Sequence, residues 1–171
     1  SSTFKEEEKK YIDIVLSTSI SRKSFLFQKI FSMIIKNLII AYSLFLSIII
    51  STIFFDLKIV IWNIFSICFY LFLLSNAFGT LTVFISTRFK KSSLIYGIPS
   101  SIAVLSYIIY SIEPLIDSFK EIKYIFLFYF YKGSDPLING FHNWHWIIFA
   151  IISIIFINLA LYFWNLRDID T

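Results

Sequence analysis

The chain has 171 residues, of which 58% are hydrophobic and only 15% are charged, and its formal net charge is +4. Soluble domains carry about 25% charged residues, and a chain of this length has too little interior to hide so much apolar surface. The composition therefore excludes an ordinary water-soluble domain and favours an integral membrane protein. The single cysteine, Cys68, excludes a disulfide within the chain.

The first 29 residues are rich in charge and predict a cytoplasmic segment with a helix of its own. Thr3 and Glu6 fit a capping box, in which the two side chains satisfy free amides at the helix start. Three residues form the apolar face of this helix: Ile12, Val15 and Leu16. Residues 17–19, Ser-Thr-Ser, end it because their side chains compete for backbone groups. Ser21 is placed to cap a second helix, which runs from Arg22 into the membrane.

Four long apolar runs follow, each with about the 18 residues needed to cross a hydrocarbon core of about 30 Å. The predicted spans cover residues 36–55, 59–87, 92–112 and 146–166. Lys36 is included in the first span because a lysine near a helix end snorkels to the interface. The predicted fold class is all-α, a polytopic membrane helix bundle with four transmembrane helices. The chain divides into a cytoplasmic segment, residues 1–29, and a transmembrane domain, residues 30–171.

The segment between the third and fourth spans predicts an external re-entrant helix. Glu113-Pro114 ends the third span, because the residue before a proline disfavours helix. Ile122–Tyr131 is apolar and aromatic but too short to cross the membrane, so we expect it to enter the outer leaflet without crossing. Trp144 and Trp146 mark the outer interface, where indole rings prefer to lie.

The positive charges alternate from one inter-span segment to the next. Eleven of the 15 lysines and arginines lie before or at the first residue of the first span, between the second and third spans, or after the fourth. Since basic residues stay on the cytoplasmic side, this asymmetry predicts a multi-pass protein of the cell membrane with both termini in the cytoplasm.

Two groups of ionisable residues were weighed as sites. His142 and His145 have a spacing that fits a shared metal on a helix, but no acidic or cysteine partner is close in sequence. Glu113 and Asp117 have the residue types of a catalytic or cation-binding pair, and we interpret them as a solvated helix end. The sequence contains no phosphate-binding loop, no acyl-transfer triad and no carboxylate cluster within the spans. We therefore expect no catalytic residue, no cofactor, no metal and no nucleic-acid partner.

Side-chain amides are rare in the last three-quarters of the four membrane runs taken together. We expect Asn63, Asn76 and Asn158 each to form a hydrogen bond to another helix. The alternative for Asn76, which is close to Gly79 in the sequence, is that it lines a path through the membrane.

Three stretches resemble the ABC type-2 permeases, the membrane subunits of a class of ATP-driven transporters. Residues 8–22, EKKYIDIVLSTSISR, with Lys29 after them, are similar to the segment before the family's third helix, with Ser19 in place of its usual proline. Residues 85–93, ISTRFKKSS, are similar to the basic cytoplasmic turn before the fifth helix. The turn at residues 130–140, the last span and Arg167-Asp168 resemble the end of the family's chains.

The resemblance extends over essentially the whole chain and implies a coupling segment followed by the last four of six helices. It implies the membrane subunit of an ABC exporter, whose partners are a separate ATPase subunit, a second permease chain in a homo- or heterodimer, and membrane lipid. The implied ATPase-coupling residues are Glu8, Ile12, Asp13, Val15, Leu16, Ser21 and Arg22.

Two alternatives stay open at this point. The amphipathic helix is also typical of a segment that lies on an anionic lipid surface, although the acidic run Glu6–Glu8 disfavours that surface. The alternative function is a non-transporting membrane scaffold or immunity-type protein derived from a permease.

Overall fold

The computed structural model describes residues 22–89, 91–112, 126–132, 135–141 and 144–166. Every regular element within these ranges is a helix. The long helices are α2 (Arg22–Phe54), α3 (Ile61–Arg88), α4 (Ser92–Ile112) and α7 (His145–Leu166). Two short helices, α5 (Leu127–Lys132) and α6 (Pro136–Asn139), lie between α4 and α7 in the sequence.

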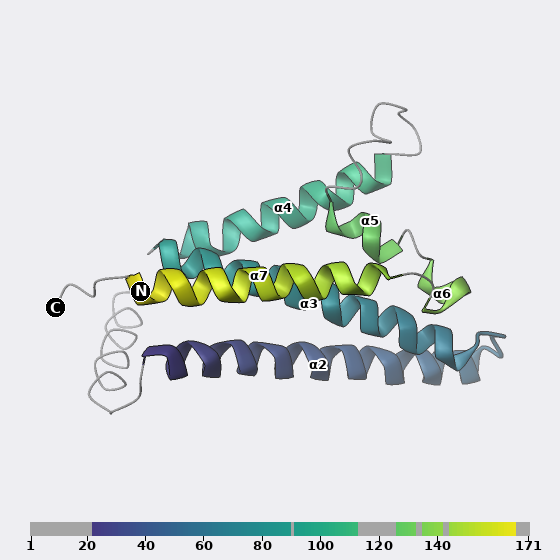
Figure 1. Cartoon of the computed structure of the whole chain (residues 1–171). Coiled ribbons are helices and arrows are strands. Elements are labelled where there is room, and N and C mark those ends of the chain that lie inside the picture. The colour runs from purple at the N-terminus through teal and green to yellow at the C-terminus, as the bar shows by residue number, and fades with distance from the viewer. Residues whose placement is uncertain (1–21, 90, 113–125, 133–134, 142–143, 167–171) are drawn as a thin grey trace.

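Helix α3 is the central element of the bundle. It contacts α2, α4, α5, α6 and α7, and the four long helices alternate in direction along a common axis (Figure 1). In its most apolar window 44% of the residues are buried, whereas none is buried in the corresponding window of α2. Helix α2 therefore lies at the edge of the bundle and presents most of its surface outward.

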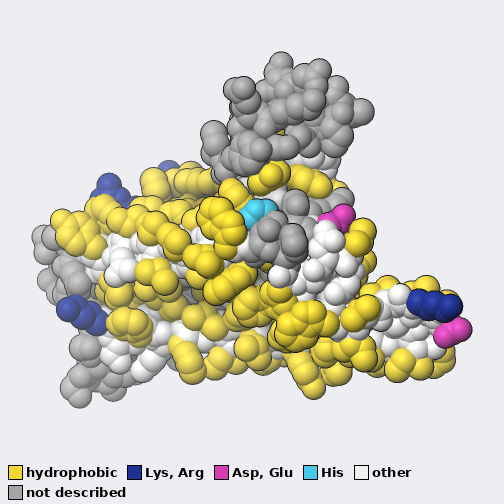
Figure 2. All heavy atoms as spheres, turned by 45° about the vertical axis from the view of Figure 1, so that its right-hand side comes forward, with side chains coloured by type: hydrophobic (Ala, Val, Ile, Leu, Met, Phe, Trp, Pro, Cys, Tyr) yellow, Lys and Arg dark blue, Asp and Glu magenta, His cyan; other side chains and the backbone are white. Residues whose placement is uncertain are grey.

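The surface of the bundle is apolar in a way that only a bilayer tolerates. Within the described residues, four helices are long and apolar enough to cross a membrane. Hydrophobic side chains cover most of the visible face, and charged side chains lie toward its two ends (Figure 2). Phe31, Trp62 and Tyr96 are each at least 60% exposed, although such side chains are normally buried in soluble proteins. The chain is a polytopic, all-α membrane protein, as its composition predicts.

The ends of α3, α4 and α7 agree closely with the predicted spans, whereas α2 begins well before its predicted span. Helix α2 begins at Arg22 and passes through residues 29, 30 and 36 without a break. Its 33 residues measure about 50 Å at about 1.5 Å per residue, well above the hydrocarbon thickness of about 30 Å. The helix predicted to run from Arg22 into the membrane is therefore confirmed. The predicted span boundary at residue 36 marks the start of the uncharged stretch inside this helix, because an interfacial lysine does not end helical hydrogen bonding.

The segment predicted to be re-entrant contains helix α5. This helix starts at Leu127 and ends at Lys132, while residues 122–125 lie outside the described part of the chain. Its six residues are too short to span a bilayer. Tyr131 packs against the core around Tyr70 and Phe149. Burial, and to a smaller extent the nearby Cys68 thiol, raises the pKa of the Tyr131 phenol, which indicates apolar surroundings.

Two apolar clusters hold the described helices together. The first is formed by Tyr70, Leu74 and Ala77 of α3 with Phe149 of α7, and α5 packs against it. The second is formed by Leu26 and Ile30 of α2 with Ala160 of α7. The first cluster therefore fixes α7 and α5 on α3, and the second fixes the beginning of α2 on the end of α7.

Candidate functional site

The predicted ATPase-coupling residues lie at or before the start of the described chain. Arg22 is the first residue of α2, and its side chain is not described. The others, Glu8, Ile12, Asp13, Val15, Leu16 and Ser21, lie outside the described residues. The described chain therefore contributes the helix that continues from this segment, together with the polar groups that this helix presents to the bundle.

A pair of asparagines joins α2 to α3 near the middle of both helices. The Asn37 amide nitrogen donates to the Asn76 side-chain oxygen at 3.2 Å. The Asn76 amide nitrogen donates to the Phe72 carbonyl at 2.8 Å, so both ends of this buried side chain have partners. A polar side chain in an apolar span is costly unless it is hydrogen-bonded, so this pair fixes the register of the two helices.

The helices approach closely one turn from the asparagine pair. Gly79 of α3 faces Met33 of α2, and a Cβ built on Gly79 would overlap the Met33 Sδ. The buried Thr80 hydroxyl donates to the carbonyls of Asn76 and Ala77 at 2.9 and 3.0 Å. Small residues at a helix contact allow such an approach in membranes, where packing and hydrogen bonds hold helices together. We call Met33, Asn37, Asn76, Gly79 and Thr80 the polar layer.

The chemistry of the polar layer is suited to holding helices together and not to acid–base catalysis. Amides and hydroxyls exchange hydrogen bonds without titrating near neutral pH. Lys36 is adjacent to the layer in sequence, and its side chain is exposed on α2. Because a lysine is expensive in hydrocarbon, we expect Lys36 to extend toward the interface.

Basic side chains lie over aromatic rings where α2 begins and where α3 and α7 end. The Arg88 guanidinium lies 4.5 Å from the centre of the Phe163 ring, and the Lys29 ammonium lies 5.1 Å from that of Phe25. Phe25 in turn stacks on Trp164, with ring centres 6.3 Å apart. These cation–π contacts hold basic side chains against the packed helices at the end of the bundle where α2 begins, which carries most of the basic residues.

A third polar contact joins α3 to the short helix α6. The Asn63 amide nitrogen donates to the carbonyls of Leu137 and Ile138, both at 2.9 Å. Gly140, which ends α6, has a φ of +66°, and a side chain there would press against the Asn63 oxygen and the Trp62 ring. The asparagine therefore anchors the segment before α7 to the beginning of α3.

The predicted interhelical role of the asparagines is confirmed for two and wrong for one. Asn63 and Asn76 bond to other elements, whereas the Asn158 amide donates to Ile154 in its own helix at 2.8 Å. Asn158 is exposed on α7, and its acceptor is the carbonyl one turn earlier in the same helix. The partner, Asn37, lies beside Lys36 near the start of the first apolar run, and its position in the sequence does not indicate its bond to Asn76.

His145, the first residue of α7, lies among aromatic rings. Its Nδ1 is buried without a hydrogen-bond partner within the described chain, and its ring meets Phe130 edge-on at 5.5 Å. His142 lies outside the described residues, so the structure does not place the two histidines together. No group of three His, Cys, Asp or Glu side chains in the described ranges is arranged to hold a metal.

Comparison with known proteins gives no match: no family model, no curated protein and no solved structure is significantly similar to the chain.

Proposed function

We propose that this chain is a membrane-spanning subunit of an ABC transporter that works as an exporter in the cell membrane. ATP hydrolysis takes place on a separate subunit, and a second permease chain, identical or different, completes the translocation path. Both termini are cytoplasmic in this proposal, and residues 1–29 couple the chain to the ATPase.

The observation that carries the proposal is the continuity of α2. Its first eight residues, 22–29, belong to the predicted coupling segment, and it runs as one helix from Arg22 to Phe54. A helix resists bending because each residue adds a backbone hydrogen bond, so a displacement at its start moves the whole element. This is the rigid connection that an ATP-driven membrane subunit needs between a soluble ATPase and its spans.

The contacts of α2 pass such a displacement to the rest of the bundle. Leu26 and Ile30 pack against Ala160 of α7 close to the start of α2. Further along, the hydrogen bond from Asn37 to Asn76 joins α2 to α3. The contact near the start acts directly on α7, and the polar layer acts as the point where α2 and α3 stay in register.

The charge distribution supports the proposed orientation. Lys23 of α2, Arg88 of α3 and Lys91 before α4 share the end at which α2 begins. The opposite end carries Asp56, Lys58 and Asp135, with Lys132 at the end of α5, so its acids and bases are balanced in number. By the positive-inside rule, the end at which α2 begins is cytoplasmic.

The test replaces the apolar face of the coupling segment. We expect the double variant Ile12→Ser and Leu16→Ser to lose the ATPase during purification and to lose substrate-stimulated ATP hydrolysis in a reconstituted complex. Each well-buried residue contributes about 2 kcal/mol, which is roughly a thirtyfold change in affinity per residue. Ile14→Ser is the matched control, because Ile14 lies about 200° from Ile12 on the predicted helix.

Unchanged co-purification and ATP hydrolysis in the folded double variant would remove the segment as the coupling element. Its amphipathic helix would then be assigned to the lipid surface, where serine substitutions weaken vesicle binding instead.

A further inference from the structure

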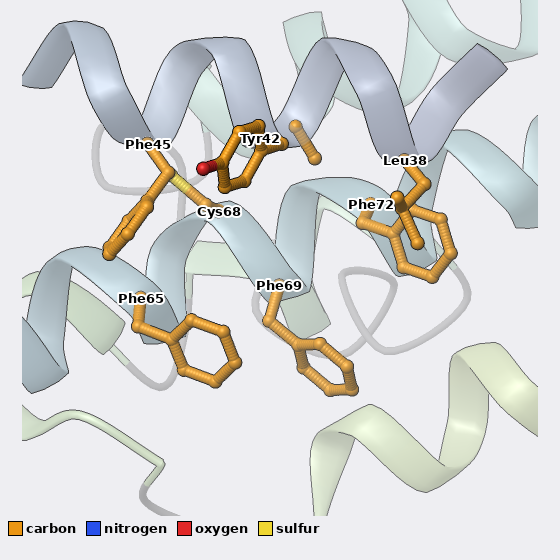
Figure 3. Close-up of a pocket in the computed structure, with 8 residues that line it drawn as sticks. Leu38, Tyr42, Phe45, Phe65, Cys68, Phe69 and Phe72 are labelled. Atoms are coloured by element: carbon orange, nitrogen blue, oxygen red, sulfur yellow. The ribbon is translucent and has the colours of Figure 1, made fainter. Parts of the chain in front are cut away.

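A pocket of about 370 Å³ opens between α2 and α3, beyond the polar layer on the side away from the start of α2. Both helices contribute four residues to its wall. The lining residues are Leu38, Ala41, Tyr42, Phe45, Phe65, Cys68, Phe69 and Phe72. Leu38 and Phe72 lie at one end, Phe45 and Phe65 lie at the other, and the remaining labelled side chains lie between them (Figure 3).

The rim of the pocket faces the surroundings of the bundle. Leu38 and Tyr42 of α2 are 54% and 59% exposed, and Phe65 of α3 is 42% exposed, although all three line the pocket. Cys68, by contrast, is only 6% exposed and forms the floor. Since both helices are membrane spans, the pocket opens to the hydrocarbon of the bilayer and not to water.

The lining selects against polar and charged occupants. Its polar groups are one phenol and one thiol, and no charged side chain takes part. Cavities with such walls stay dry, since a water needs two or more polar partners, and they bind apolar molecules instead. An apolar cavity of about 150 Å³ is large enough for benzene, so this pocket has room for several fused rings.

The aromatic side chains form a connected wall along α3. Phe65 and Phe69 stack with ring centres 6.2 Å apart, and Phe45 of α2 meets Phe65 edge-on at 6.1 Å. Phe141, from the segment before α7, packs on both Phe65 and Phe69 from outside the pocket, at 5.8 and 5.4 Å. These contacts hold the rings in place, so the wall exists before any ligand enters.

We infer that the α2–α3 pocket binds an uncharged, planar aromatic molecule that enters from the bilayer. Five of the eight lining residues are aromatic. A planar aromatic ligand gains offset-stacked and edge-on contacts with such rings, which a lipid acyl chain of equal area does not gain. The absence of a charged group from the lining excludes recognition of an ionic ligand at this place.

The test uses the full chain in lipid nanodiscs without any ATPase, so its outcome is independent of the proposed function. The probe is a naphthyl diazirine, which is added at increasing concentrations and photolysed at each one. The labelled peptides are identified by mass spectrometry, and the extent of labelling is measured against the probe concentration. We expect saturable labelling of the pocket residues on α2 and α3. Anthracene should compete with this labelling, whereas its saturated analogue perhydroanthracene should compete at least about threefold more weakly.

Two variants and one control locate the binding. Ala41→Phe fills the pocket and should abolish saturable labelling. Phe45→Leu keeps the wall apolar and should weaken the affinity by about threefold to tenfold, because one ring contact is lost. Ser43→Phe is the matched control, since Ser43 is exposed on the opposite side of α2 and its hydroxyl bonds within that helix at 2.8 Å.

The opposite results are equally clear. Labelling that is spread over all lipid-facing helices and does not saturate would overturn the inference. Equal competition by anthracene and perhydroanthracene would overturn it in favour of an acyl chain. Circular dichroism of each variant establishes that loss of labelling is not loss of the fold, and Phe45→Leu decides the outcome if Ala41→Phe does not fold.

Discussion

At the scale of single residues, a few small and polar side chains determine how α2 meets α3. Asn37 and Asn76 share a hydrogen bond at 3.2 Å, and Gly79 leaves room for Met33. The surrounding Phe, Ile and Leu side chains contribute bulk but little register, since lipid tails are as apolar as they are. The position of one amide, or of one missing Cβ, is therefore more informative here than the many apolar residues.

Gly79→Ala tests this close approach. The added methyl would overlap Met33, so Met33 has to change its rotamer or the helices have to separate. Overpacking costs about 1 kcal/mol, the low end of its range because Met is flexible. Since every helical Gly→Ala change also gains helix propensity, we expect Gly79→Ala to be about 1 kcal/mol less stable than a Gly→Ala variant without this contact. The measurement is denaturant unfolding in mixed micelles.

Gly97→Ala is the control, because a Cβ at Gly97 meets nothing within 4 Å. That variant should gain about 0.5–1 kcal/mol through helix propensity. Equal effects of the two substitutions would show that Gly79 is not a packing contact.

At the scale of elements, the sequence identified the helices well and their mutual contacts poorly. The span predicted at residues 92–112 coincides with α4, and the spans at 59–87 and 146–166 differ from α3 and α7 by at most two residues. Helix length and hydropathy are local properties, which explains this agreement. The helix from Arg22 was also predicted correctly, whereas the span boundary at residue 36 lies inside α2 because charge marks an interface and not a helix end. The pairing of Asn37 with Asn76 and the α2–α3 pocket depend on which faces meet, and one sequence does not specify that.

The contact between α3 and α6 is the element-level feature most open to experiment. Asn63→Leu removes both hydrogen bonds to Leu137 and Ile138. Each is worth about 1 kcal/mol net, so we expect the amides of residues 138–140 to exchange with deuterium at least about tenfold faster.

Asn158→Leu serves as the control, since that amide bonds only within its own helix among the described contacts. Exchange that is equally fast in the two variants would mean that Asn63 does not hold α6.

At the scale of the whole molecule, the four long helices alternate in direction, and the predicted coupling segment, residues 1–29, includes the first two turns of α2. Lys23, Arg88 and Lys91 share one end of the bundle, while Asp56, Lys58 and Asp135 share the other. Every mechanistic statement about ATPase coupling requires that the first of these ends be cytoplasmic. The proposed transport function therefore depends first on the membrane topology.

The most direct measurement is labelling of single cysteines in intact cells by a membrane-impermeant maleimide. Lys58→Cys and Ser92→Cys are introduced separately into a Cys68→Ala background, since both positions are exposed at opposite ends of the bundle. If the end at which α2 begins is cytoplasmic, we expect Lys58→Cys to react in intact cells and Ser92→Cys to react only after the membrane is opened. Reaction of both cysteines from outside, or of Ser92→Cys alone, would contradict this topology.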